Sequence, residues 1–266
     1  MSTTAYYPTD LTEAQWTLLR TLLPARKWRP GGPGRPPCDL RQVLNGLLYL
    51  LKTGCQWRMV PREFGKWNTI YSYFKCWRET GVWAKLMEAL RQCERRRQGR
   101  QAEPSAGSVD SQSIKTATQA TEVGFDGGKQ VKGRKRHLLV DTLGLVVAVV
   151  VTAANTDDRV GLMILLLQYF VGDVRRLRKL WVDGGYQAEW VAQWVRDLKC
   201  TYKIDLEVTS PEGRGFQIVP WRWAAERTFA WLLNDRRHSR DYETLTVNSE
   251  AMIQLSMIRL LLNRRH

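Results

Sequence analysis

The sequence predicts an α/β fold with a mixed sheet, preceded by an all-α region that resembles a helix-turn-helix domain. Apolar residues recur at helical spacing through residues 9–97. After a short polar stretch, runs of β-branched residues alternate with helical patterns from residue 107 onward. We therefore expect a helical domain over residues 1–98 and an α/β domain over residues 107–266.

The first domain is predicted to contain four helices with clear start and stop signals. They span residues 9–23, 39–53, 67–80 and 82–97. Thr9 or Asp10 is the expected N-cap of the first helix, and Asp39 that of the second, because short polar side chains accept hydrogen bonds from the first turn. Gly54 is expected to end the second helix, since glycine adopts the left-handed conformation without strain.

The second domain is predicted to have strands and helices in the order of a mixed sheet. A short strand ends near Asp110, a hairpin over residues 134–154 turns at the letters DTLG, and a third strand ends at Asp183. A last strand is expected over residues 201–209, and helices over residues 159–171, 187–199, 221–235 and 247–265. Ligands of such sheets collect at the carboxyl ends of strands, which is where this pattern places Asp110 and Asp183.

The charge of the chain indicates a polyanionic partner. The formal net charge is +15 at pH 7. Residues 1–100 hold 18 Lys and Arg against 7 Asp and Glu, so most of the surplus lies in the helical domain. Cations that neutralise phosphates release condensed counterions, which favours nucleic acid as the partner. An acidic membrane surface is the competing interpretation.

Other classes of protein are disfavoured by the composition. The five cysteines form no C-x-x-C pair, so neither a disulfide framework nor a zinc cluster is expected. Three histidines are too few for a histidine-rich metal site. No signal peptide and no apolar run of about 18 residues is evident, so a soluble cytoplasmic protein without a membrane partner is expected.

Carboxylates are the candidate catalytic groups of this sequence. Two Mg²⁺ ions can activate an attacking oxygen and stabilise a leaving oxygen in phosphodiester cleavage, and Mg²⁺ prefers carboxylate ligands. Local sequence rules favour Asp110 and Asp183 no more than three other aspartates, which are Asp141, Asp157 and Asp158. An aspartate after a strand is most often a turn former.

Several segments resemble one family throughout the chain. The segments are SVDSQSIK, GRKRHLLVDTLG, ANTDDRVG, LWVDGGYQ and AAERTFAWLLNDRRHSRDYE, with LTEAQWTLLRTLLP, GRPPCDLRQVLNGLLYLLKTGCQWRMVP and FGKWNTIYSYFKCWRETGVW before them. They resemble DDE transposases of bacterial insertion sequences, of the insertion-sequence-five group within the insertion-sequence-four-like superfamily. The resemblance covers nearly the whole chain in order.

This resemblance implies a ribonuclease H-like catalytic domain and a metal site. Asp110, Asp183 and Glu226 match the family's catalytic triad and are expected to bind two Mg²⁺ ions, for which Mn²⁺ is expected to substitute. The implied activity is cleavage and strand transfer of double-stranded DNA at the terminal inverted repeats of an insertion sequence. A homodimer or larger assembly on DNA, in the bacterial cytoplasm at the nucleoid, is implied as well.

The glutamate helix departs from the family pattern of Tyr, two residues, Arg, three residues, Glu, six residues, Lys. Arg222 and Glu226 fit, whereas Val219 and Leu233 stand at the Tyr and Lys positions. Cations one turn further could replace the missing lysine, a solvated helix face being the alternative. The cations predicted to contact DNA in this segment are Arg222, Arg236 and Arg237.

Four further residues near the predicted site receive weaker interpretations. Asn155 and Asp158 match a family motif after the third strand and are interpreted as ordering groups. Trp221 and Trp223 flank Arg222 and are candidates for stacking on a flipped base, with core packing as the alternative.

Two segments are predicted to bind DNA. The glycine-rich run at residues 127–137 suits phosphate contact, a solvated charge run being the alternative, and its cations are Lys129, Lys132, Arg134, Lys135 and Arg136. Residues 55–80 are predicted to form a helix-turn-helix with a recognition helix from Trp67 to Arg78. Its polar side would present Asn68, Thr69, Ser72, Lys75 and Arg78, and its inner side Tyr71, Phe74 and Trp77.

Two rival functions remain open from the sequence. A transposase-derived DNA-binding repressor would need a damaged acidic triad, and a structure-selective nuclease of the same fold would cut DNA without joining it.

Overall fold

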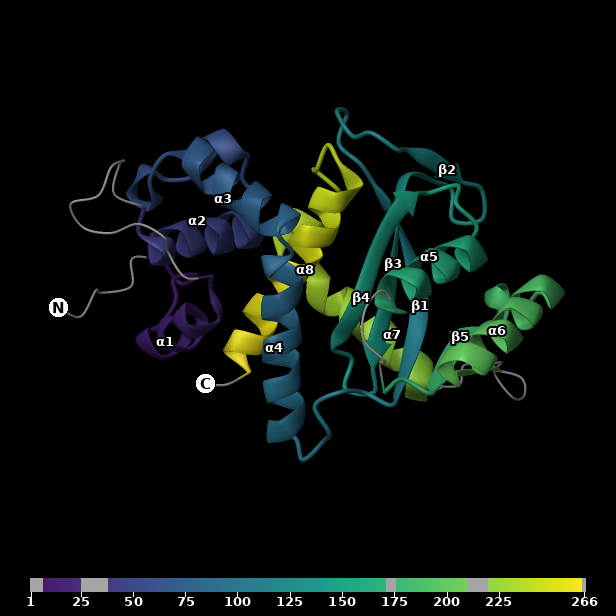
Figure 1. Ribbon diagram of the computed structural model, residues 1–266. Coiled ribbons are helices and arrows are strands. Elements are labelled where there is room, and N and C mark those ends of the chain that lie inside the picture. The colour runs from purple at the N-terminus through teal and green to yellow at the C-terminus, as the bar shows by residue number, and fades with distance from the viewer. Residues whose placement is uncertain (1–6, 25–37, 171–175, 210–219, 265–266) are drawn as a thin grey trace.

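The computed structural model describes residues 7–24, 38–170, 176–209 and 220–264, apart from some side chains in the second half of α6 and at the start of α7. Within these ranges the chain forms an N-terminal helical region and a mixed sheet with helices on both faces (Figure 1). The fold class predicted from the sequence is therefore confirmed.

The helical region begins with four α-helices at the predicted places. They are α1 (Glu13–Leu22), α2 (Leu40–Thr53), α3 (Trp67–Glu79) and α4 (Val82–Arg97), with the 3-10 turns η1 (Trp57–Met59) and η2 (Arg62–Phe64) between α2 and α3. Asp39 caps α2 through Arg41 N at 2.9 Å, and Gly54 ends it at φ 68°. The cap of α1 is Thr12, in a capping box with Gln15, rather than Thr9 or Asp10.

The sheet has six strands in the order β2-β3-β1-β5-β6, with β4 also paired to β3. The strands are β1 (Ala106–Lys115), β2 (Gly124–Asp126), β3 (Val131–Asp141), β4 (Val146–Ala153), β5 (Lys179–Asp183) and β6 (Asp205–Thr209). The predicted hairpin is β3–β4, and its turn ends at Gly144 with φ 76°. β5 and β6 join in parallel, as crossover helices require. The short strand β2 was not predicted.

Two apolar cores lie on the two faces of the sheet. On one face, α5 (Asp158–Phe170) and the start of α6 (Glu189–Tyr202) pack against β1, β4 and β5. On the other face, α7 (Pro220–Leu233) and α8 (Thr246–Asn263) cover the hairpin. None of the described helices is long and apolar enough to cross a membrane.

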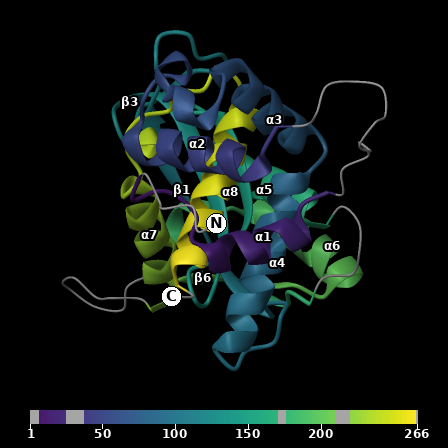
Figure 2. The ribbon, with the colours of Figure 1, turned by 90° about the vertical axis from the view of Figure 1, so that its left-hand side faces the viewer.

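Helix α8 joins the helical region to the sheet. It lies between α4 and β4 (Figure 1), and it also contacts α2 and α3, behind which it runs in the second view (Figure 2). Leu50 of α2, Val149 of β4 and Leu255 of α8 belong to one continuous core. The polar stretch before β1 therefore connects two regions that share one apolar core.

Glu250 of α8 anchors the edge strand β4. Its carboxylate accepts a hydrogen bond from Val151 N at 3.0 Å, and burial raises the pKa of Glu250 to about 7. A carboxyl group with a raised pKa in the folded state destabilises the fold as pH rises from its unfolded value through its folded value.

We expect Glu250→Gln to stabilise the protein at pH 8 by about 3 kcal/mol, and by much less at pH 5, because it removes the buried charge and keeps an acceptor for Val151. Urea unfolding at both pH values measures this. Glu189→Gln, an exposed change on α6, is the control. An equal stability gain at both pH values would contradict the assignment.

Candidate active site

Asp110 and Asp183 lie on neighbouring parallel strands. The β1–β5 pairing runs from Ala106 opposite Lys179 to Ser108 opposite Trp181. The same register, continued by two residues, places Asp110 level with Asp183. Asp110 and Asp183 are 73 positions apart, which is the same offset that separates the paired residues Ser108 and Trp181.

The strand position of Asp110 differs from the prediction. Asp183 is the last residue of β5, as predicted, but β1 continues for five residues beyond Asp110. The second half of β1 pairs with β3, with Asp110 opposite Leu138 and Lys115 opposite Gly133, and Lys115 O also accepts a hydrogen bond from Asp241 N at 2.9 Å. Asp110 therefore lies two residues beyond the last paired residues of β1 and β5, where β1 has no parallel neighbour.

Both aspartates are half-buried and held by nearby backbone groups. Asp110 Oδ1 accepts a hydrogen bond from Ser111 N at 2.7 Å. Asp183 Oδ1 accepts one from Gly185 N at 2.9 Å, which caps the 3-10 turn η3 (Gly184–Tyr186). These bonds fix the two carboxylates at one edge of the sheet, which we call the acidic edge.

Asp158, the first residue of α5, is a third carboxylate beside Asp110. Its Oδ1 accepts a hydrogen bond from Ser111 Oγ at 2.8 Å and lies 3.0 Å from Lys135 Nζ. Burial opposes ionisation, but the bond from Ser111 and the Lys135 ammonium outweigh it, so the pKa of Asp158 lies below its usual value. The sequence identified Asp158 only as an ordering group. The sequence signal for this residue is the pair Asp157–Asp158, which follows the second strand of the hairpin.

Lys135 connects this carboxylate to Asp126 of β2. Its ammonium lies 3.7 Å from Asp126 Oδ2 and donates to Thr156 O at 2.9 Å. A hydrogen bond from Ser113 and the nearby lysines keep the pKa of Asp126 low. Asp126, Lys135, Asp158 and the predicted Asn155 line a polar hollow of about 320 Å³.

Tyr186 lies beneath the acidic edge. It is 1% exposed. Burial and the carboxylates of Asp158, Asp110 and Asp183 raise the pKa of Tyr186 well above its ordinary value, so its hydroxyl stays protonated. The sequence gives no separate signal for this residue, which stands three positions after Asp183 in the segment WVDGGY.

Glu226 lies on the exposed face of α7, the helix that packs on β1. Ala225 and Thr228 face inward, and Thr228 Oγ1 donates to Gly144 O at 2.6 Å. Among the residues that the structure describes, no three His, Cys, Asp or Glu side chains are close enough to hold one metal ion. The structure thus brings Asp110 and Asp183 together and leaves Glu226 outside a shared cluster.

Three cations of the run at residues 127–137 are buried, so the prediction that they contact phosphate is wrong for them. Arg134 is 0% exposed and forms an ion pair with Asp241 at 3.3 Å. Arg136 is also buried, and burial lowers its pKa to about 10. Lys135 is taken up by the carboxylates already described. On β3 these residues face inward or toward the acidic edge rather than toward solvent.

Lys129 and Lys132 are exposed, as DNA contacts require. Lys129 Nζ also donates to Ser111 O at 3.2 Å, which places this ammonium beside the residue that follows Asp110. The Lys129 ammonium therefore lies next to the acidic edge.

The predicted recognition helix is α3, and its packing follows the predicted pattern in part. Phe74 and Trp77 are buried, whereas Asn68 and Lys75 are exposed. Arg78 is instead engaged within the chain, with Asn248 of α8 and with Glu79 at 2.8 Å.

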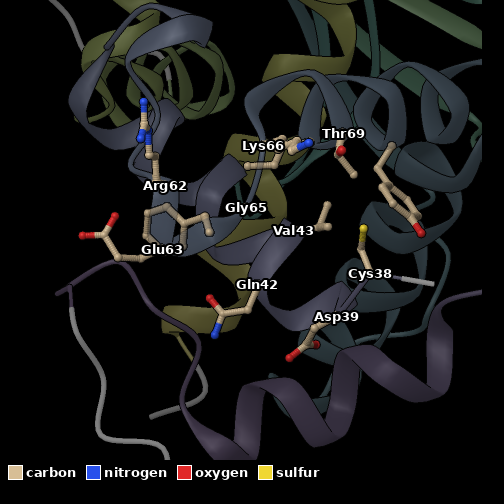
Figure 3. Close-up of a pocket in the computed structure, with 12 residues that line it drawn as sticks. Cys38, Asp39, Gln42, Val43, Arg62, Glu63, Gly65, Lys66 and Thr69 are labelled. Carbon is tan, nitrogen blue, oxygen red and sulfur yellow. The ribbon is translucent and has the colours of Figure 1, made fainter. Parts of the chain in front are cut away.

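A hollow of about 620 Å³ lies at the start of α3, between α2 and the segment Arg62–Thr69 (Figure 3). Val43, Phe64 and Ile70 form apolar parts of its lining. Arg62 and Lys66 belong to the same lining and are exposed, a pair that the sequence analysis missed.

The cations near α7 have different environments. Arg237 is buried, pairs with Glu243 at 2.6 Å and donates to Cys55 O at 2.9 Å, so the prediction that it contacts DNA is wrong. Arg236 is exposed. The side chain of Arg222, and that of Trp221, lie outside the described residues. Trp223 is 45% exposed and stacks on the Arg227 guanidinium, 4.4 Å from the ring centre.

Two family models match the chain. Residues 11–87 match a putative transposase of the IS4/5 family, and residues 101–261 match the transposase DDE domain.

Two proteins of Burkholderia cepacia are similar to part of the chain. An uncharacterized 16.2 kDa protein of insertion element IS402 is 38% identical over 112 residues, or 41% of this chain and 75% of that protein. A putative transposase for insertion sequence element IS402 is 31% identical over 111 residues, or 40% of this chain and 51% of that protein. No solved structure gives a significant match. The mixed sheet, the level pair Asp110 and Asp183, and a domain match over most of the chain agree, and the chain belongs to the DDE transposase family.

Proposed function

We propose that this chain is an active transposase that binds the terminal inverted repeats of an insertion sequence, cleaves DNA there and joins the freed end to target DNA. The observation that carries the proposal is the parallel pairing of β1 with β5, whose register, extended by two residues, puts Asp110 and Asp183 near the same edge of the sheet. Neighbouring carboxylates on a rigid sheet suit hard divalent cations.

Two carboxylates at this edge, Asp110 and Asp183, suit a hard divalent cation, and a third ligand would have to join them to complete the site. We propose that Asp110, Asp183 and Glu226 hold two Mg²⁺ ions, for which Mn²⁺ substitutes. Such ions supply activation of the attacking oxygen and charge stabilisation of the leaving oxygen.

The chain's own residues would position the DNA. Asp110 and Asp183 would act on the reacting phosphate through the cations that they hold. Lys129, whose ammonium lies beside Ser111, and the exposed Lys132 further along β3 would neutralise other phosphates of the strand. Glu226 comes from a helix that packs on β1, and DNA binding is expected to bring its exposed side chain to the edge. Arg236 is a further candidate contact.

The helical region is the proposed reader of the DNA ends. Asn68 and Lys75 on α3 face solvent, and Arg62 and Lys66 lie beside the start of that helix. A helix with an exposed polar side flanked by cations suits the major groove and its phosphates. Because transposition joins two ends, a dimer or larger assembly on DNA is expected.

Cleavage of a plasmid that carries the element's ends, in Mg²⁺ or Mn²⁺, tests the proposal. We expect wild type to cut at the ends and Asp183→Ala to bind equally in a gel shift but not to cut. Binding without cleavage by either protein would instead favour a repressor, and cutting without joining would favour a nuclease. Equal cleavage by both proteins would exclude Asp183 from the site.

A further inference from the structure

Two arginines stack on Trp231 and have no ion-pair partner among the described residues. The guanidinium carbon of Arg227, on α7, lies 4.7 Å from the centre of the Trp231 ring, and that of Arg264, at the end of α8, lies 4.3 Å from it. Arg227 also stacks on Trp223 and donates a hydrogen bond to Leu143 O at 3.0 Å. These contacts hold both guanidinium groups in place.

The carboxylates that act on these two arginines already have partners of their own. They are Glu94 and Asp141. Glu94 accepts hydrogen bonds from Arg97 at 2.7 and 2.9 Å. Asp141 is buried and pairs with Arg95. In the described part of the chain this cluster therefore holds four arginines and two carboxylates, and its two excess positive charges fall on the arginines at the tryptophan.

This excess charge is unfavourable in the free protein. Burial lowers the pKa of Arg264, and the positive charge of Arg227 lowers it further, although the two carboxylates act in the opposite direction. Burial also lowers the pKa of Arg227. Both side chains are half-buried, so an anion can reach them from solvent. A phosphate would offset the desolvation and the mutual repulsion, because the N–H donors of a guanidinium group match its oxygens.

We propose that Arg227 and Arg264 bind a phosphate group of the DNA backbone, on the flank where α7 and the end of α8 lie side by side (Figure 2). This inference rests on the proposed function, because it adds a contact to a chain already proposed to hold DNA. The contact carries no sequence information, since every nucleotide has the same phosphate. Arg227 directly follows Glu226, so a phosphate bound there would bring the DNA to the helix that carries this glutamate.

The test measures how the DNA affinity of the full chain depends on KCl concentration, in wild type, Arg227→Gln and Arg264→Gln. Each variant is expected to lower the slope of log affinity against log salt concentration by about one, which corresponds to about tenfold weaker binding at about 0.1 M KCl. The loss is expected to be the same for a duplex with the element's ends and for an unrelated duplex. Arg196→Gln, which changes an exposed arginine of α6 that contacts Gln193 at 3.1 Å, is the matched control and is expected to keep the wild-type slope.

Thermal melting without DNA separates phosphate binding from a structural role of the stack. Arg264→Gln is expected to melt no lower than wild type, because it removes a like charge from beside Arg227. Inorganic phosphate, added at constant ionic strength, is expected to raise the melting temperature of wild type more than that of Arg264→Gln.

Two results would overturn the inference. Wild-type salt slopes in both variants would show that no DNA phosphate lies at this site, even if inorganic phosphate binds there. A lower melting temperature of Arg264→Gln with an unchanged salt slope would assign the stack a structural role only.

Lys132→Met separates this failure from that of the proposed function. If Lys132→Met lowers the salt slope while both arginine variants keep it, only the inference about the arginines falls. If wild type cuts no duplex in Mg²⁺ or Mn²⁺ but the arginine variants still lower the slope, the proposed activity falls and the phosphate contact stands.

Discussion

Glu226→Gln is expected to lower the rate of DNA cleavage by about a thousandfold or more, without lowering the stability of the free protein. The side chain is exposed on α7, and the glutamine side chain keeps its size and one hydrogen-bonding oxygen. Loss of one carboxylate from a two-metal site removes several kcal/mol of transition-state stabilisation. Single-turnover cleavage of an end-containing duplex, together with thermal melting, measures both quantities.

Asp158→Asn is the informative comparison for this prediction. Asp158 pairs with Lys135 at 3.0 Å, so its replacement is expected to cost about 2 kcal/mol of stability. We expect its cleavage defect to be smaller than that of Glu226→Gln. The opposite ranking, with Glu226→Gln as active as wild type, would make Asp158 the third acidic residue of the site and Glu226 a surface residue.

Arg134→Met is expected to destabilise the protein by about 3–5 kcal/mol, a large share of the stability of a domain. Its guanidinium is 0% exposed. It donates to Thr121 O at 3.0 Å and to Glu243 O at 2.8 Å, and it pairs with Asp241 at 3.3 Å. Removing the cation leaves the buried Asp241 carboxylate without its charge partner and several carbonyl groups without their donor. Urea unfolding measures the loss.

Lys132→Met is the matched control on the same strand. Lys132 is exposed, so we expect little change in stability but weaker DNA binding, with a salt dependence reduced by about one phosphate contact. If Arg134→Met folded as stably as wild type and lost only DNA binding, the structural assignment of Arg134 would be wrong and the first interpretation of the basic run would hold.

Local patterns were enough to predict most elements. Helix α2 shows why, since a capping aspartate, a continuous apolar stripe and a glycine in the left-handed region all mark its ends. The β3–β4 hairpin is similarly marked by β-branched runs around a turn that ends at Gly144. Such signals act over a few residues and need no knowledge of the rest of the chain.

Strand positions and the family resemblance were enough to predict Asp110 and Asp183 as candidate residues. The register of the paired residues of β1 and β5 supports their placement near one edge of the sheet. Lysine and arginine on β3 were wrongly interpreted, because sequence letters do not show which carboxylates and carbonyls of distant segments will surround a cation. Arg134 finds its partners at residues 241–249, more than 100 positions away. The Asp158–Lys135 pair was missed because it too forms only when separate segments pack together.

The position of α8 between the helical region and the sheet also bears on the order of events during synthesis. Segments made first usually fold first, as each leaves the ribosome. Here α2, α4 and the β3–β4 hairpin all complete their core against a helix that is translated after every other described element. A nascent chain would therefore expose apolar surface on both parts until Asn263 has emerged, and the helices that are proposed to hold DNA would become rigid only when the catalytic sheet does.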